Sequence, residues 1–271
     1  MDRATSTDET AVASAVEARH LEVAEVLRRV DESVLLGESL LEGWSRLTIA
    51  CHLRYGAEAS RRMTTETLAG GATSFYPDGR DQQRPATLRP HDGESSTDVV
   101  ESLREESEEL DRLWRRLTPE QWQRTVNEPD DNPDLGPITL AQLALLRLTE
   151  VEVHGYDLDL GLSPWSITFV EAALPMRLHW LTTRRSNHRV PDLSIGGTWA
   201  LSAIDGSTFL VRASEDATVE EATGTVAADA TIIGTGSELL AHLLGRLALS
   251  SLRVEGDRGH AEAFLTAFPA P

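Results

Sequence analysis

The chain has 271 residues and a formal net charge of −19 at pH 7, which disfavours a nucleic-acid partner because phosphate binding requires a concentrated basic surface. No apolar run approaches the roughly 18 residues of a membrane-spanning helix, so we expect no membrane partner. Residues 1–12 are polar and acidic, whereas a signal peptide begins with a basic segment and an apolar run, and we therefore expect a cytoplasmic protein.

The first half of the chain predicts helices separated by loops. Ser45 is a suitable N-cap for the second main helix. Residues 70–96, which follow that helix, are rich in Gly, Pro and polar residues and predict a long irregular loop, a kind of segment that is more often functional than idle. A second loop is expected at residues 128–137. Apolar residues at helical spacing indicate an antiparallel four-helix bundle, with main helices at residues 9–30, 46–69, 97–117 and 138–158.

The second half of the chain predicts an α+β fold. After a further helix at residues 167–185, two alternating segments flank Asp205-Gly206, which is a strong hairpin signal. We expect two domains, a helical bundle at residues 1–162 and a smaller α+β domain at residues 163–271. The remaining elements of the second domain are expected to be a strand, a helix, a strand and a helix at residues 228–237, 237–249, 252–257 and 260–268.

The last helix of the bundle carries two ionisable residues on an apolar face. Glu150 and His154 are one turn apart and follow leucines on the same face. An uncompensated buried carboxylate is costly, so we expect an ion pair between these two residues, a salt bridge to another helix, or a shared metal ion. Glu152 and Asp159 lie off this face and are expected to be exposed to solvent.

His52 is the candidate for a third metal ligand, because it shares a small or apolar helix face with Ile49, Gly56 and Ala59. Two histidines and one glutamate form a catalytic zinc set with an open coordination position, and also the facial triad of non-haem iron. The single cysteine, Cys51, excludes a Cys-rich zinc module and an intrachain disulfide, and we expect it to be a small buried hydrophobe. Spacing alone leaves open whether these residues bind a metal.

Two segments resemble the paired signature of the mycothiol-dependent maleylpyruvate isomerase family, namely GWSRLTIACHL (Gly43–Leu53) and RLTEVEVHGYDL (Arg147–Leu158). That family belongs to the DinB-like metalloenzymes, which are four-helix bundles that hold a divalent metal, usually zinc. The resemblance implies His52, Glu150 and His154 as the metal ligands, and the actinobacterial thiol mycothiol as cofactor. The segment SELLAHLLGRLAL, followed by LRVEGD, is similar to the sterol-carrier-like C-terminal domain that accompanies many members.

Several arginines are candidates for holding carboxylates, because a guanidinium binds a carboxylate through two parallel hydrogen bonds. In the long loop, where family members hold substrate, we predict Arg80 and Arg84 as cofactor-binding residues, with Arg89 as a further candidate. Arg246 matches a Gly-Arg position of the family's C-terminal domain and is predicted to be catalytic.

Other residues near the two signature segments have more modest expected roles. Asp157 is a predicted catalytic residue that would hydrogen-bond a ligand imidazole or the sugar hydroxyls of the thiol. Trp44 and Tyr156 are expected to pack against the bundle. His20 has no partner at metal spacing and is expected to be structural or on the surface.

Together these features predict a divalent-metal-dependent enzyme that acts on a small electrophilic substrate. An open metal position deprotonates a bound thiol near neutral pH. We expect mycothiol S-transfer or thiol exchange, and the alternative is cis–trans isomerisation of maleylpyruvate, since both reactions begin with thiolate addition to an electrophilic carbon. A non-catalytic metal- or ligand-binding sensor is the alternative of another class, although the retention of three ligand residues disfavours it.

Overall fold

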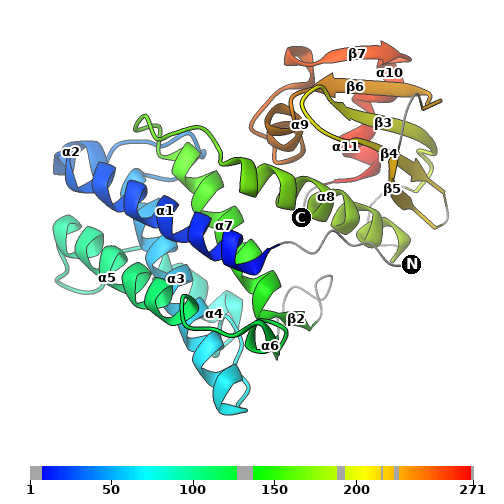
Figure 1. Ribbon diagram of the computed structural model, residues 1–271. Coiled ribbons are helices and arrows are strands. Elements are labelled where there is room, and N and C mark those ends of the chain that lie inside the picture. Colours follow the sequence, from blue (N-terminus) through cyan, green and yellow to red (C-terminus); the bar gives the residue numbers. More distant parts are fainter. Residues whose placement is uncertain (1–7, 127–136, 188–192, 215, 223–225, 270–271) are drawn as a thin grey trace. The chain divides into compact units, whose positions relative to one another are not determined.

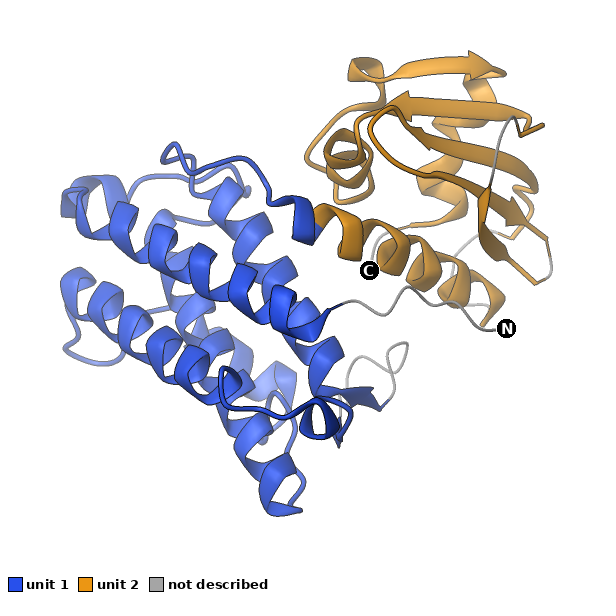
Figure 2. Cartoon of the chain, viewed as in Figure 1, with its two compact units in different colours: residues 1–169 blue, residues 170–271 orange. Residues whose placement is uncertain are grey.

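The structure, a computed structural model, describes residues 8–126, 137–187, 193–214, 216–222 and 226–269. The chain divides into two compact units, residues 1–169 and 170–271 (Figure 2). The predicted loop at residues 128–137 lies almost wholly outside the described residues. In the part of the chain that the structure describes, no helix has the length and apolar character needed to cross a membrane.

The first unit is a bundle of four long helices, as predicted (Figure 1). These helices are α1 (Glu9–Arg28), α3 (Arg46–Ala69), α5 (Ser96–Trp114) and α7 (Leu140–Asp157). Helices α1 and α3 each pack against both α5 and α7. Apolar side chains at helical spacing fill the interior, because each helix buries a stripe against its neighbours. The buried set includes Val16, Leu27, Ile49, Leu53, Leu110 and Leu148.

Side-chain caps mark where these helices begin. The Ser45 hydroxyl accepts a hydrogen bond from the Thr48 amide at 3.1 Å, so the predicted cap of α3 is confirmed. Helix α7 begins at Leu140, after a capping Thr139, and not at residue 138. The reason is that Ile138 pairs with Val126 in a two-stranded sheet made of β1 (Thr125–Val126) and β2 (Ile138–Thr139). Such caps contribute about 1 kcal/mol each.

Three short helices complete the first unit, α2 (Glu32–Leu35), α4 (Arg80–Thr87) and α6 (Pro119–Trp122). Helix α4 lies within residues 70–96, so the prediction of a wholly irregular loop there is wrong. Its sequence, RDQQRPAT, contains Pro85 and has no apolar period. Arg, Gln and Ala favour a helix, but the proline and the lack of an apolar period conceal that preference in the sequence. In the structure α4 packs against α3.

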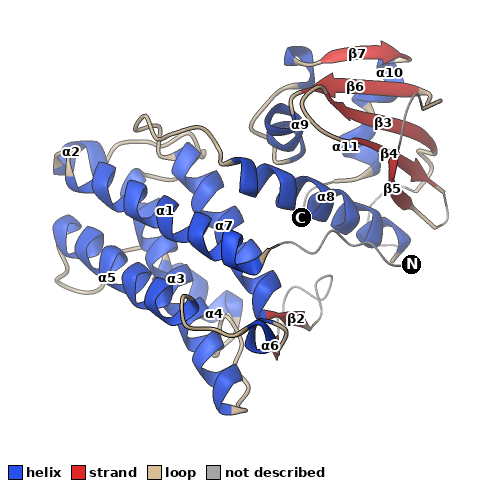
Figure 3. Ribbon diagram, in the orientation of Figure 1, coloured by secondary structure: helices blue, strands red, loops and turns tan. Residues whose placement is uncertain are grey.

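The second unit contains a five-stranded sheet, which confirms the α+β class (Figure 3). The strand order is β5-β4-β3-β6-β7, with β3 and β6 parallel and all other neighbours antiparallel. Asp205-Gly206 forms the turn between β3 and β4, as predicted. The strands are β3 (Gly197–Ala203), β4 (Thr208–Ala213), β5 (Thr218–Ala222), β6 (Ala230–Gly234) and β7 (Arg253–Gly256).

The helices of the second half are shorter than the sequence predicts, except α8, which matches the predicted helix at residues 167–185. Helix α9 ends at Leu243, because Gly245 adopts a left-handed conformation with φ of 73°. Helix α8 runs across the division between the two units, so the predicted domain boundary after residue 162 stays a prediction. The helices are α8 (Ile167–Ser186), α9 (Gly236–Leu243), α10 (Arg258–Glu262) and α11 (Phe264–Ala267), with a 3-10 turn at Leu249–Ser251.

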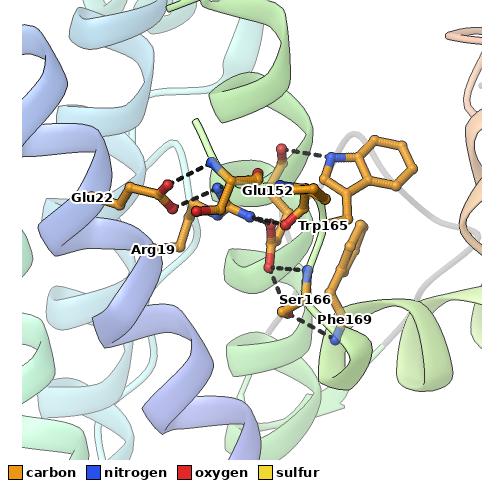
Figure 4. Close-up of polar contacts among 8 residues, drawn as sticks. Arg19, Glu22, Glu152, Trp165, Ser166 and Phe169 are labelled. Carbon is orange, nitrogen blue, oxygen red and sulfur yellow. Dashed lines mark hydrogen bonds and ion pairs between the residues drawn. The ribbon is translucent and has the colours of Figure 1, made fainter. Parts of the chain in front are cut away.

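A buried ion pair holds the segment after α7 against the bundle (Figure 4). Arg19 of α1 pairs with Glu152 of α7, and both side chains are almost completely buried. The Arg19 guanidinium also donates to the carbonyl oxygens of Ser163 and Pro164, each at 3.0 Å. The segment is therefore tied to two helices of the bundle before α8 begins.

The burial of Glu152 contradicts the expectation that this side chain would be solvated, since only 1% of it is exposed. Its carboxylate accepts hydrogen bonds from the backbone amide and hydroxyl of Ser166, at 3.2 and 2.6 Å, and its carbonyl accepts one from the Trp165 indole at 2.9 Å. The segment after α7 thus covers a side of that helix that the apolar pattern leaves open. Asp159, in contrast, is exposed as predicted.

Candidate metal centre

Three side chains from two neighbouring helices converge on one point. His52 comes from α3, while Glu150 and His154 come from successive turns of α7. The Nε2 atom of His52 lies 2.7 Å from Oε2 of Glu150, and Nε2 of His154 lies 3.5 Å from the same oxygen. One ligand atom from each residue lies within 4.8 Å of the other two. Ligand atoms around a tetrahedral zinc ion are about 3.3 Å apart, so this donor set fits a divalent cation with little adjustment.

Asp157 orients the ring of His154. The Nδ1 atom of His154 lies 3.1 Å from Oδ2 of Asp157, whose side chain is buried. A carboxylate only accepts hydrogen bonds, so Nδ1 carries a proton and Nε2 faces Glu150. An outer carboxylate that orients a ligand histidine in this way is common in metal sites. The structure places Asp157 in one of the two contacts expected for it, and its part in catalysis stays a prediction.

The charges at the site favour an ionised glutamate. Partial burial alone would raise the pKa of Glu150, but hydrogen bonds with His154 and His52 lower it well below its usual range. Burial lowers the pKa of His154, whereas the carboxylates of Asp157 and Glu150 raise it more, to about 9. Burial lowers the pKa of His52 in spite of its hydrogen bond to Glu150. Glu150 is therefore an anion between the Nε2 atoms of two imidazoles, and an ionised carboxylate is the form that binds a divalent cation.

The site is partly exposed to solvent, and the Trp44 ring forms a wall beside both imidazoles. The side chain of Glu150 is 45% exposed. The Trp44 ring stacks nearly parallel on His154, with centroids 5.9 Å apart, and meets His52 edge-on at 5.4 Å. Above the Trp44 ring lies the guanidinium of Arg84, with Cζ 5.7 Å from the ring centroid. Such a contact between a cation and an aromatic face is attractive.

Trp44 was missed as a site residue, because the sequence suggested only packing against the bundle. Its position directly before the capping Ser45 of α3 was the available signal, since it puts the indole at the entrance to the helix that carries His52. Arg84, in contrast, was predicted, and α4 brings it to the wall of the site. Its role in binding the cofactor stays a prediction.

The remaining residues that the sequence singled out differ in their burial and their contacts. Arg80 is the first residue of α4 and is exposed, while Arg246 belongs to the second unit, where it donates to the Leu244 carbonyl at 2.7 Å. Tyr156 is 48% exposed, and its ring meets the Trp165 ring with centroids 5.9 Å apart, so it packs with only part of its surface. Cys51 is fully buried as expected, and burial raises the pKa of its thiol to about 11. The functions proposed for Arg80 and Arg246 stay predictions.

Comparisons with known proteins identify a family. Residues 16–159 match the family model described as mycothiol maleylpyruvate isomerase N-terminal domain. Two crystal structures of a mycothiol-dependent maleylpyruvate isomerase share the fold over 94% of this chain and 96% of theirs. One is of a histidine-to-alanine mutant, with 16% identity and a TM-score of 0.65. The other has 18% identity and a TM-score of 0.62.

A third solved structure, YfiT from Bacillus subtilis, is similar over 59% of this chain and 89% of that one, with 16% identity and a TM-score of 0.46. It is described as a probable metal-dependent hydrolase with an unusual four-helix bundle topology. No curated protein matches the chain. The family model covers more than half of the sequence, so the resemblance inferred from the two helical segments is confirmed.

Proposed function

Because the chain belongs to the mycothiol maleylpyruvate isomerase N-terminal domain family, we propose that it is a divalent-metal-dependent enzyme that uses mycothiol as a nucleophile. The observation that carries this proposal is the convergence of two imidazole nitrogens and one carboxylate oxygen within 4.8 Å. Three protein ligands with one open side are typical of a catalytic metal site, whereas structural zinc sites are closed by four ligands.

His52, Glu150 and His154 would hold the cation, with zinc as the proposed metal. When bound, the cation would supply Lewis-acid activation that lowers the pKa of a coordinated thiol and makes it a thiolate near neutral pH. Asp157 retains the Nδ1 proton of His154 and so keeps Nε2 directed at the site. Cys51 is excluded as the nucleophile, because it is buried and its pKa is raised to about 11.

Trp44 and Arg84 are proposed to receive the reactants at the open side. The indole forms a flat apolar wall beside both imidazoles. The guanidinium of Arg84, held over that wall, offers two parallel donors to a carboxylate of the thiol or of the electrophile. A bound reactant would thus have its charged group anchored and its reactive carbon near the sulfur.

We propose S-transfer or thiol exchange on a small electrophile as the reaction. The thiolate sulfur forms a bond to an electrophilic carbon, and the electron pair moves onto the electron-withdrawing group or leaves with a departing group. Isomerisation of maleylpyruvate is the second candidate, favoured by the similarity in fold to an isomerase over 94% of the chain. In that reaction the same adduct rotates about the former double bond and then expels the thiolate.

Metal content and thiol turnover test this proposal. Wild type is expected to bind one divalent metal ion per chain, and His52→Ala is expected to lose stoichiometric binding. His91→Ala serves as the matched control, because that histidine side chain is 76% exposed. Mycothiol consumption is then measured with monobromobimane and with maleylpyruvate. A wild-type protein without stoichiometric metal would refute the metal mechanism, and metal without any thiol turnover would favour a sensor.

A further inference from the structure

A buried chain of three polar side chains runs through the bundle beside the candidate metal centre. Asp111 of α5 accepts a hydrogen bond from Nδ1 of His20 on α1, at 2.9 Å. Arg147 of α7 donates from Nε to Nε2 of His20, at 3.0 Å. The three residues are 5%, 5% and 2% exposed, in that order. His20 is therefore buried, and it lies between a carboxylate and a guanidinium.

The two neighbours determine the protonation of His20. A carboxylate only accepts and an arginine Nε only donates, so His20 carries its proton on Nδ1 and is neutral. Burial, together with the charge of Arg147, lowers the pKa of His20, in agreement with that state. The neutral imidazole thus holds one edge of the Arg147 guanidinium in place and leaves the other edge free to act.

The two terminal nitrogens of Arg147, Nη1 and Nη2, form a fork that has no partner in the described part of the chain to explain its burial. Both atoms are buried, and neither has a hydrogen-bond partner among the described residues. Buried donors on a charged group are costly when unpaired. The space for this fork is provided by Gly56 of α3, where an added Cβ would lie 2.6 Å from Nη1. Gly56 is one turn beyond His52, and Arg147 is one turn before Glu150, so the fork lies between the two ligand-bearing helices.

We propose that Arg147 is a positioning residue for Glu150, whose second carboxylate oxygen, Oε1, accepts hydrogen bonds from the Arg147 fork when Oε2 serves as the metal ligand. Helical side chains lean toward the N-terminus and meet residues three or four positions earlier, which directs Glu150 over Arg147. Both imidazoles face Oε2, so Oε1 is the oxygen left for this contact. Ligand carboxylates are typically held by such outer hydrogen bonds, and loss of one costs about 10- to 100-fold in metal affinity.

This inference rests on the proposed metal site, so the test begins with equilibrium metal affinity, measured by chelator competition on the full chain. Arg147→Met is expected to weaken binding about 10- to 100-fold, and Arg147→Lys less, because it keeps the charge and loses the fork. Gly56→Ala removes no polar group, but its added Cβ would push the Arg147 fork aside. This variant is also expected to weaken metal binding. Visible spectra of the cobalt-substituted protein should change with Arg147→Met and with Gly56→Ala.

Arg19→Met is the matched control for the loss of a buried arginine. Arg19 is also almost fully buried and also contacts α7, but its partner is Glu152 and not Glu150. This variant is expected to lose stability while its metal affinity stays within about twofold of wild type. A drop in affinity as large as that of Arg147→Met would overturn the proposal, since it would assign the effect to general loosening of the bundle.

A double-mutant cycle identifies the residue through which Arg147 acts. In a Glu150→Gln background, Arg147→Met is expected to change the remaining metal affinity by less than about twofold; an undiminished effect there would overturn the proposal. If Arg147→Met fails to fold, Arg147→Lys and Gly56→Ala provide the test. Wild-type metal affinity in both variants would refute the role of Arg147 and leave the proposed metal site standing. A wild-type protein without metal affinity would remove the proposed function and this inference together.

Discussion

Glu152→Ala is expected to lower the free energy of unfolding by about 3 kcal/mol, because it leaves the Arg19 guanidinium buried without its principal partner. Breaking one side of a buried ion pair costs about 3–5 kcal/mol. Arg19 retains the Glu22 carboxylate and two backbone carbonyls as acceptors, which places the cost at the lower end. Glu152→Gln still accepts from Ser166 through its one oxygen, but its NH2 group then faces Arg19 in place of the second carboxylate oxygen. It therefore also loses the ion pair, and a cost of about 2–3 kcal/mol is expected.

Urea unfolding followed by circular dichroism, with metal removed by a chelator, measures these differences. Glu25→Ala is the matched control, because Glu25 pairs with Arg29 on the exposed surface of α1 and such pairs contribute about 0.3–0.5 kcal/mol. A Glu152→Ala variant within about 1 kcal/mol of wild type would refute the view that this ion pair ties the segment after α7 to the bundle.

Four further outcomes are expected. Asp157→Asn should weaken metal binding about 10- to 100-fold, measured by chelator competition; unchanged affinity would argue against its orienting role. Trp44→Ala should reduce thiol turnover by about threefold to tenfold, since aromatic contacts contribute about 0.5–1.5 kcal/mol, whereas Trp44→Phe should retain most activity in the same assay. The pKa of His20 is lowered by burial, so below about pH 6.5 the unfolded chain binds a proton that the folded chain does not. The free energy of unfolding, measured by urea unfolding, should therefore decrease as the pH is lowered below that value, and should decrease less in His20→Gln. Cys51→Ala should retain thiol turnover, and the native Cys51 should resist iodoacetamide at pH 8, because its pKa is raised to about 11; rapid alkylation of the folded protein would contradict this.

Features set by near neighbours in the chain were predictable from the sequence. Four amphipathic segments give the four long helices, Ser45 caps α3, and Asp205-Gly206 turns between β3 and β4. The pairing of Glu150 with His154 follows from their four-residue spacing on α7, and His52 was singled out by its place on an apolar face. The structure brings the three residues together, and metal binding itself stays a prediction.

Features that depend on distant segments were decided only by the tertiary structure. Helix α7 is covered by α1, by α3 and by the segment that follows it, so Glu152 is buried although its position in the helical period predicted exposure. Arg147 is likewise buried by distant segments, and its partner His20 is 127 positions away in the sequence. Helix α4 also depends on tertiary contacts, and it places Arg84 over Trp44. The sequence by itself determined which residues can form helices and offer ligands, because periodicity and capping are local. Only packing decided which polar side chains are buried and what they contact, because burial depends on every element that covers a residue.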